Sequence, residues 1–242
     1  MNLFIVNSGS MGNCYLLESN KNLLVLDAGI PWKSLVRACN YNLFSINAVL
    51  ISHEHGDHVK CAEDLNAACI PIFGNRAVKA KFPYVHELPK ARSADVGGWK
   101  VTPFEVPHTH SDGTECQNYA YLIRRNEMTF LYATDFQYIG NNGKEYSFKS
   151  FNINHFLIAV NYTDLDDEDK SGKISHVVRG HSSLETVKEF LKTSMTDACK
   201  TVIACHLSSR NADEEKIVRE LTELVPKTVN VVIAKKGMTL TL

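Results

Sequence analysis

The sequence predicts an α+β fold in which two mixed β-sheets pack face to face with helices on the outside. Two observations support this prediction: each half of the 242-residue chain runs from several short strands into helices, and no low-complexity linker divides the halves. A chain of this length can bury a substantial core, and layered folds of this size often form one domain. We therefore expect a single domain over residues 1–242.

The first half is expected to open with strands and then to alternate helix and strand. Turn-rich segments separate the first three strands, which we expect at residues 3–6, 14–17 and 23–26. Proline is a favourable first helical residue, so Pro31 predicts a helix to about Ala38. An apolar run predicts a buried strand at residues 48–51. The apolar spacing that follows predicts one helix over residues 57–69.

The remaining elements are expected to be further strands and then an alternating segment. Strands are expected at residues 70–73, 99–106, 119–124 and 128–133. The alternating segment comprises a strand at 156–160, a helix at 183–192, a strand at 201–205 and a helix at 213–224. Strands at residues 229–233 and 237–242 complete the second half.

The composition fits a globular protein and gives no charge signal for a polyanionic partner. Hydrophobic residues make up 44% of the chain, and the formal net charge is −1. Contact with nucleic acid or an anionic membrane would therefore have to come from a local patch. The seven cysteines include no Cys-x-x-Cys pair, no secretory leader precedes the first expected strand, and no apolar run approaches a membrane span. We therefore expect a reducing, cytoplasmic setting and no membrane partner.

Residues 53–58 read His-Glu-His-Gly-Asp-His directly after an expected strand. Imidazole and carboxylate groups are standard ligands for zinc and related cations. His53 and His55 lie two residues apart, so extended backbone would point both rings to one side, where they can share one metal ion. Asp57 and His58 are adjacent and project differently, which suits them better to a second ion. The alternative interpretation is a solvated polar turn.

Three further candidate ligands follow apolar strands elsewhere in the chain: His108, Asp135 and His206. Ligands at the ends of neighbouring strands converge on one rim, so we expect all three to lie together. His110 is the alternative to His108. We favour His108 because it lies nearer the rigid end of the strand. For Asp135 the alternative role is a helix or turn cap.

His181 differs because it precedes an expected helix. Ser182 and Glu185 have the spacing of a capping box, which places His181 at a helix N-terminus. Backbone N–H groups and the helix dipole favour an anion such as phosphate there, and a histidine could donate a proton to a leaving oxygen. The alternative is a surface histidine beside an N-cap.

Other polar residues give weaker signals. Six basic residues could form a phosphate track if they fold together, although dispersed surface charge is the simpler interpretation: Lys79, Lys81, Lys90, Arg92, Arg124 and Arg125. We interpret His86, His155 and His176 as surface or core residues. The acidic run at residues 164–169 predicts an exposed loop, because it lacks the Gly and the spaced Glu of a calcium loop.

In their order along nearly the whole chain, these motifs resemble those of the metallo-β-lactamase superfamily. They are the Ser-Gly-Ser-Met-Gly-Asn turn at 8–13, Leu-Asp-Ala-Gly at 26–29, the cluster at 53–58, His108, Thr134-Asp135, Gly-His-Ser-Ser at 180–183 and Cys-His-Leu-Ser at 205–208. The resemblance implies an αββα sandwich with a dinuclear metal site along one edge. The opening turn and the two late motifs most resemble the WalJ-type exonucleases and the phosphonate-pathway cyclic phosphodiesterases.

The resemblance also implies roles for individual residues. His53, His55 and His108 would hold one metal ion, Asp57, His58 and His206 would hold the other, and Asp135 would bridge the two. Asp27 is similar to the superfamily's aspartate that orients a ligand. Relatives often carry Asp directly after the residue that matches His108. Here Thr109 and His110 follow instead, so the choice between His108 and His110 stays open.

The function expected from these residues is metal-dependent phosphodiester hydrolysis, as in a DNA exonuclease, and the sequence does not distinguish a DNA end from RNA or a small cyclic phosphodiester as the substrate. Two divalent cations, Zn²⁺ with Mn²⁺ or Fe²⁺ as alternatives, would share a hydroxide that attacks phosphorus. Asp57 and His181 are the candidate catalytic residues, with His181 as the proton donor. The expected partner is a phosphodiester such as a nucleic acid end, contacted mainly through its backbone phosphate.

Three other functions are left open. A thioesterase or a lactonase would direct the same hydroxide at a carbonyl group. A redox di-iron protein is disfavoured because His55 stands where such relatives usually place a carboxylate. A catalytically silent metal-binding protein would have lost one or more ligands, and none is lost here. The sequence does not decide the oligomeric state.

Overall fold

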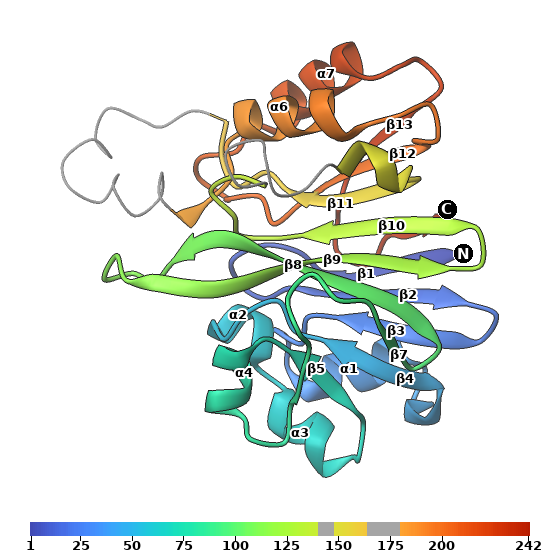
Figure 1. The fold of residues 1–242 in the computed structure, drawn as a ribbon, viewed down its shortest axis with the longest axis vertical. Coiled ribbons are helices and arrows are strands. Elements are labelled where there is room, and N and C mark those ends of the chain that lie inside the picture. Colours follow the sequence, from blue (N-terminus) through green and yellow to red (C-terminus); the bar gives the residue numbers. More distant parts are fainter. Residues whose placement is uncertain (140–147, 164–179) are drawn as a thin grey trace.

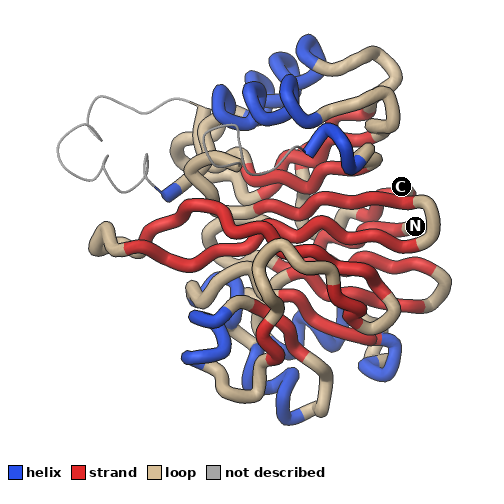
Figure 2. The backbone as a smooth tube through the Cα atoms, in the orientation of Figure 1, coloured by secondary structure: helices blue, strands red, loops and turns tan. Residues whose placement is uncertain are grey.

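The computed structural model describes residues 1–139, 148–163 and 180–242. Two seven-stranded mixed sheets pack face to face, with helices on their outer faces (Figures 1 and 2). The predicted αββα arrangement is therefore confirmed. The two ends of the chain lie side by side in Figure 1, because the last strand pairs with the first. Within the described residues, no helix is both long and apolar enough to cross a membrane.

The first sheet contains the N-terminal strands and the strand that leads into the histidine-rich segment. In spatial order it comprises β14 (Thr239–Thr241), β1 (Asn2–Asn7), β2 (Cys14–Ser19), β3 (Asn22–Leu26), β4 (Ile46–Leu50), β5 (Ile72–Gly74) and β6 (His86–Glu87). The strands from β3 to β6 are parallel, so β3 and β4 end at the same edge. Its outer face carries α1 (Trp32–Ala38), α2 (Gly56–Val59), α3 (Ala62–Ala67) and α4 (Arg76–Lys81).

The second sheet contains the long central hairpin and the C-terminal α/β segment. In spatial order it comprises β13 (Asn230–Ile233), β12 (Thr201–Cys205), β11 (His155–Ala159), β10 (Met128–Ala133), β9 (Glu115–Arg125), β8 (Trp99–Thr109) and β7 (Ala94–Val96). The strands from β10 to β13 are parallel, so their C-terminal ends share one edge. Helices α6 (Leu184–Ser194) and α7 (Glu214–Leu224) cover the outer face (Figure 1). Two short 3-10 helices lie at Leu43–Ser45 and Phe148–Phe151.

Strands that are buried on both faces hold the layers together. In β3, Leu24 and Leu26 pack between the two sheets, whereas Leu23 and Val25 pack against the helices below the first sheet. This alternation follows from the two-residue period of a strand. Each sheet is thereby fixed on both faces, so the residues that follow its strands are held on a rigid frame.

The structure contradicts the single helix expected over residues 57–69, because α2 and α3 are separate helices that meet near Cys61. The backbone N–H of Cys61 donates to the carbonyl of Ala28 at 3.0 Å instead of to Asp57, four residues earlier. The Asp57 carbonyl accepts from the backbone N–H of Asn13 at 2.8 Å. Tertiary hydrogen bonds therefore replace the helical ones at this point, which apolar periodicity along the chain does not indicate.

Several shorter features were also not predicted. Helix α4 and strands β6 and β7 were not predicted. Strand β8 extends to Thr109, beyond the expected end at residue 106, and β9 begins at Glu115 instead of at residue 119. Helix α4 is capped by Asn75, whose side-chain oxygen accepts from the backbone N–H of Val78 at 2.9 Å. The acidic run at 164–169 and His176 lie outside the described residues.

One buried histidine predicts a loss of stability in acid. His155, at the start of β11, is 1% exposed, and burial, with a smaller effect of Lys200, lowers the pKa of its imidazole to about 4. The unfolded chain, with a histidine pKa near 6.5, then binds a proton that the native protein does not bind, so the free energy of unfolding falls as the pH drops below about 6.5. Between about pH 7 and pH 5, we expect the free energy of unfolding to fall by about 2 kcal/mol less in His155→Leu than in the wild type.

Urea unfolding at both pH values measures this effect as the change in the free energy of unfolding. The exposed His86, on β6, offers a matched control because His86→Leu removes the same group from the surface. An unfolding free energy that falls equally with pH in the wild type and in His155→Leu would contradict the prediction.

Candidate metal centre

Three histidines gather where the segment after β4 meets the end of β8. His53 and His55 follow the first-sheet strand β4, and His108 lies in the second-sheet strand β8. His53 Nε2 lies 3.0 Å from His55 Nδ1, which lies 3.2 Å from His108 Nε2. The three nitrogens all lie within 4.8 Å of one another. One nitrogen of each ring therefore faces a common point, and we call these residues the three-histidine group.

Four further residues form a second, mixed group beside the first: Asp57, His58, Asp135 and His206. Asp135 Oδ2 lies 2.9 Å from His58 Nε2 and 3.1 Å from His206 Nε2. The same oxygen is 3.9 Å from His53 Nε2 in the three-histidine group. The carboxylate of Asp135 therefore faces both groups, as a bridging ligand would.

The turns after three strands bring polar residues to this shared edge. Asp27 follows β3, Asp135 follows β10 and His206 follows β12, and their φ angles are 56°, 43° and 50°. Positive φ is uncommon for residues other than glycine, and such residues cluster at functional sites. The sharp turns allow each of these residues to leave its strand and join the edge where the two sheets meet.

Helix α2 carries Asp57 and His58, and close backbone contacts hold it against the N-terminal turns. The carbonyl of Asp57 accepts from Asn13, and that of His58 accepts from Ala28, both at 2.8 Å. A Cβ atom added to Gly29 would lie 1.5 Å from the Asp57 carbonyl oxygen. Glycine is therefore required at position 29 for α2 to approach this closely.

The outward-facing ring nitrogens have partners that orient the inward-facing ones. Asp27 Oδ2 lies 2.6 Å from His58 Nδ1, Ser52 Oγ 3.0 Å from His53 Nδ1, and the Gly180 carbonyl 2.5 Å from His108 Nδ1. With the ring proton on the outer nitrogen, each inner Nε2 presents a lone pair towards the centre. In the three-histidine group, lone pairs that converge at such short distances repel one another unless a cation lies between them, and in the mixed group carboxylates supply the negative charge that a cation would neutralise. The donor set therefore fits divalent metal ions.

The two groups differ in their charge state. Burial, together with neighbouring imidazoles, lowers the pKa of His53, and burial lowers the pKa of His108 to about 3. Burial also disfavours a charge on His206, but Asp135 outweighs it and raises the pKa of His206 to about 9. The three-histidine group is therefore already neutral at pH 7, whereas the mixed group must release protons to bind a cation.

Comparison with known proteins decides the family. A family model described as the β-lactamase superfamily domain matches residues 24–206, which is most of the chain. The chain belongs to the metallo-β-lactamase superfamily. This superfamily fold implies divalent metal binding, in agreement with the cluster of histidines and aspartates.

Known proteins resemble the chain over most or all of its length. It is 26% identical over 235 residues to the exodeoxyribonuclease WalJ of Streptococcus pneumoniae, covering 87% of this chain and 83% of the relative. The metallo-β-lactamase fold protein YhfI from Bacillus subtilis matches with a TM-score of 0.75 at 18% identity, covering 99% and 98% of the two chains. A diphosphatase from the PhnP family matches with a TM-score of 0.67 at 16% identity, covering 100% and 97%. The two structures show the superfamily fold alone.

His181 lies beside the mixed group, but not at the helix position that the sequence predicted. Ser183, rather than Ser182, caps α6, and the buried Ser182 hydroxyl donates to the Ala159 carbonyl at 2.6 Å. His181 therefore stands two residues before the cap. Its Nε2 lies 3.7 Å from Asp135 Oδ1.

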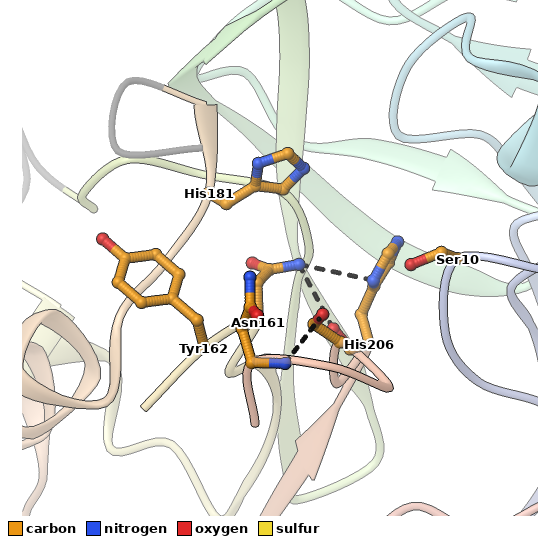
Figure 3. A pocket seen from close by; sticks show the side chains of 7 residues that line it. Ser10, Asn161, Tyr162, His181 and His206 are labelled. Atoms are coloured by element: carbon orange, nitrogen blue, oxygen red, sulfur yellow. Dashed lines mark hydrogen bonds between the residues drawn. The ribbon is translucent and has the colours of Figure 1, made fainter. Parts of the chain in front are cut away.

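A pocket of about 110 Å³ opens beside His181 and His206 (Figure 3). Figure 3 shows the Tyr162 ring and the His181 ring on one side of it and Ser10 on the other, beyond His206. Its lining residues are Ser10, Asn161, Tyr162, His181, His206, Ser208 and Asn211. The pocket gives a substrate access to the mixed group next to His181.

Three buried residues that contact the candidate ligands or Asp27 were not predicted from the sequence. Asn161, which follows β11, donates from Nδ2 to Asp135 Oδ1 at 3.0 Å and to the His206 carbonyl at 3.2 Å. Tyr132 donates its hydroxyl proton to Asp27 Oδ2. Asn13 Nδ2 lies 3.3 Å from Asp57 Oδ2. Asn161 could have been found, because it is one more polar residue directly after an apolar strand.

The structure separates the remaining candidates from the two groups. His108 joins the three-histidine group, whereas His110 lies outside it, with its Nδ1 2.9 Å from His55 Nε2. His86 is exposed and His155 is buried in the core. Several of the basic residues considered for a phosphate track have separate local partners, in agreement with dispersed surface charge; Lys90, for example, pairs with Glu105 at 3.0 Å.

Proposed function

We propose that the protein hydrolyses phosphodiesters and acts as a nuclease on DNA ends. The observation that carries this proposal is the position of His181, which belongs to neither ligand group but faces Asp135 from 3.7 Å beside the pocket. A histidine in this position can donate a proton to a leaving oxygen, which phosphodiester cleavage requires. The similarity to an exodeoxyribonuclease supports DNA as the substrate.

We assign the two ligand groups to two divalent cations. The first would be held by His53, His55 and His108, the second by Asp57, His58 and His206, and Asp135 would contact both. Shells of mixed imidazole and carboxylate accept Zn²⁺, and also Mn²⁺ or Fe²⁺. When bound, the cations would supply hydroxide at neutral pH and offset the negative charge that develops on phosphate.

The side chains around the centre would orient the reactants and move the proton. The Asp57 side chain is 26% exposed, whereas those of Asp135 and His206 are 4% and 5% exposed. Asp57 is therefore the carboxylate through which the centre meets solvent, and we propose that it orients the attacking water. His181 Nε2, on the pocket side, would hold the proton for the leaving oxygen.

The pocket suits the part of a nucleotide that carries no charge. Its described lining residues offer hydroxyl and amide groups and no carboxylate, so none of them repels a phosphodiester. Ser10 and Asn211 can hydrogen-bond to sugar or base atoms, and the Tyr162 ring can stack on a base. We propose that the nucleoside next to the cleaved bond occupies this pocket.

Metal analysis combined with a substrate panel tests the proposal. The protein would be loaded separately with Zn²⁺, Mn²⁺ and Fe²⁺ and assayed on bis(4-nitrophenyl) phosphate, a thioester, a lactone and end-labelled DNA and RNA. We expect about two ions per chain and cleavage of the phosphodiesters from a DNA end. Faster turnover of the thioester or lactone, with no phosphodiester cleavage, would overturn the proposal.

The proton-donor role predicts a defect that depends on the leaving group. His181→Ala should slow DNA cleavage by about 100-fold or more, the usual contribution of a general acid. Nitrophenolate leaves readily without a proton, so bis(4-nitrophenyl) phosphate turnover should fall much less. The ratio of the two kcat/KM values measures the effect, with exposed His86→Ala as the control. An equal loss on both substrates would contradict the role.

We also propose a reducing, cytoplasmic setting. All seven cysteines lie within the described residues, and each carries a free thiol. Such usage is typical of compartments where glutathione and thioredoxin keep thiols reduced.

A further inference from the structure

His110 is placed next to the proposed metal centre without joining either ligand group. It lies in the turn between β8 and β9, where its backbone N–H donates to the Thr114 carbonyl at 2.8 Å and its carbonyl accepts from Gly113 at 2.9 Å. Its Nδ1 is 2.9 Å from His55 Nε2, and its Nε2 is 3.4 Å from Glu54 Oε1. The ring therefore lies between a candidate ligand and a carboxylate.

The direction of the hydrogen bond between His55 and His110 follows from which nitrogen of His55 faces the other two histidines. His55 Nδ1 faces His53 Nε2 at 3.0 Å and His108 Nε2 at 3.2 Å. To bind a cation through Nδ1, the neutral ring must carry its proton on Nε2. That N–H then donates outward, and the atom in its path is His110 Nδ1.

The same reasoning fixes the tautomer of His110. If its Nδ1 accepts from His55, its own proton lies on Nε2, which is 3.4 Å from Glu54 Oε1. At this distance the Glu54 carboxylate attracts the Nε2–H group electrostatically. The outward proton of His55 therefore has an acceptor in His110, and the His110 ring is in turn held beside a carboxylate.

We propose that His110 is a positioning residue for His55, and that Glu54 and His110 together hold His55 Nδ1 towards the cation of the three-histidine group. The other two rings of that group use Ser52 and the Gly180 carbonyl for the same purpose. The inference rests on the proposed metal centre but not on the identity of the substrate.

The same residues allow a competing assignment, which is a third cation. His55 Nε2, His110 Nδ1 and Cys116 Sγ also lie within 4.8 Å of one another. To serve both this ion and the three-histidine group, His55 would have to lose both ring protons. A hydrogen bond between His55 and His110 requires no such loss, and the 2.9 Å between His55 Nε2 and His110 Nδ1 matches an ordinary hydrogen bond.

Three variants of the full chain distinguish the assignments. His110→Ala removes both contacts of the ring. His110→Asn keeps an acceptor close to the position of Nδ1 but loses the Nε2–H group beside Glu54. Cys116→Ser keeps the contact between His55 and His110 and removes the thiol of the competing site. Zn²⁺ affinity and stoichiometry would be measured by chelator competition and metal analysis, with no assay of activity.

We expect two ions per chain in the wild type and in Cys116→Ser. His110→Ala should bind the ion of the three-histidine group about 10- to 100-fold more weakly, as is usual when a partner outside the ligand shell is lost. His110→Asn should recover part of that loss. In ¹⁵N-edited spectra of the Zn²⁺-loaded protein, the His55 Nε2–H proton should be protected from exchange in the wild type and exposed in His110→Ala.

Unchanged affinity and an unchanged Nε2–H signal in His110→Ala would overturn the positioning role while leaving the metal centre intact. Three ions in the wild type, with one lost in Cys116→Ser, would overturn it in favour of a third site. A wild-type chain that binds no Zn²⁺ would instead overturn the metal centre itself, so the failures of the two proposals are distinguishable.

Discussion

Replacing Asp135 by asparagine is expected to lower phosphodiester turnover at least about 100-fold and to reduce the number of bound cations. Asp135 Oδ2 lies 2.9 Å from His58 Nε2 and 3.9 Å from His53 Nε2, so its carboxylate faces both ligand groups. Asparagine keeps the shape but removes the negative charge. Loss of partners outside a ligand shell already costs about 10- to 100-fold, and a ligand shared by two ions should cost more.

The measurements are kcat/KM on end-labelled DNA and metal content after dialysis. Asn161 donates to Asp135 Oδ1 at 3.0 Å, a contact that the asparagine oxygen preserves, so the variant is expected to fold. Asp112→Asn, in the exposed turn between β8 and β9, is the matched control. Full activity with two ions bound in Asp135→Asn would show that Asp135 is not a ligand shared by the two ions.

Gly29→Ala is expected to be the most destabilising of the substitutions considered, with a cost of roughly 3 kcal/mol or more. The new Cβ would lie 1.5 Å from the Asp57 carbonyl oxygen and 2.8 Å from the His58 backbone nitrogen. Both are backbone atoms of α2, so no side-chain rotation can relieve the clash. The helix must move away from Asn13, and it carries two candidate ligands of the mixed group with it.

Urea unfolding and metal content measure the two consequences together. Gly56→Ala is the matched control, because Gly56 begins the same helix and an added Cβ there meets nothing within 4 Å. We expect Gly56→Ala to leave the free energy of unfolding nearly unchanged or slightly higher. A Gly29→Ala protein as stable and as rich in metal as Gly56→Ala would show that the contact with α2 is dispensable.

Features that depend on neighbouring residues were predictable from the sequence. The strands expected at 128–133 and 201–205 agree with β10 and β12 to the residue, because an unbroken apolar run is the local signature of a strand buried on both faces. The polar residues after these strands, Asp135 and His206, could be selected as candidates for the same reason. A polar side chain that follows a buried strand lies at the edge of the sheet, where the candidate ligands gather.

Features that depend on distant partners were not predictable. The helix expected over 57–69 is broken at Cys61 because its backbone N–H donates to Ala28, a residue 33 positions away. The N-cap of α6 moves from Ser182 to Ser183 because the Ser182 hydroxyl donates to the Ala159 carbonyl at 2.6 Å and lies 2.9 Å from Asn161 Oδ1. In both places the local pattern was valid, but a long-range hydrogen bond competes for the same backbone or side-chain group.

By itself, the sequence determined the fold class and which residue types could form a metal centre, because strand periodicity and the chemistry of imidazole and carboxylate are local properties. The resemblance to the superfamily implied how those residues divide but left the choice between His108 and His110 open, and only the tertiary structure decided that choice. It places His108 with His53 and His55, directs His110 to the outer nitrogen of His55 across 55 positions of sequence, and places Asp135 between the groups. These choices depend on how two sheets meet at one edge, which is decided by packing across the core.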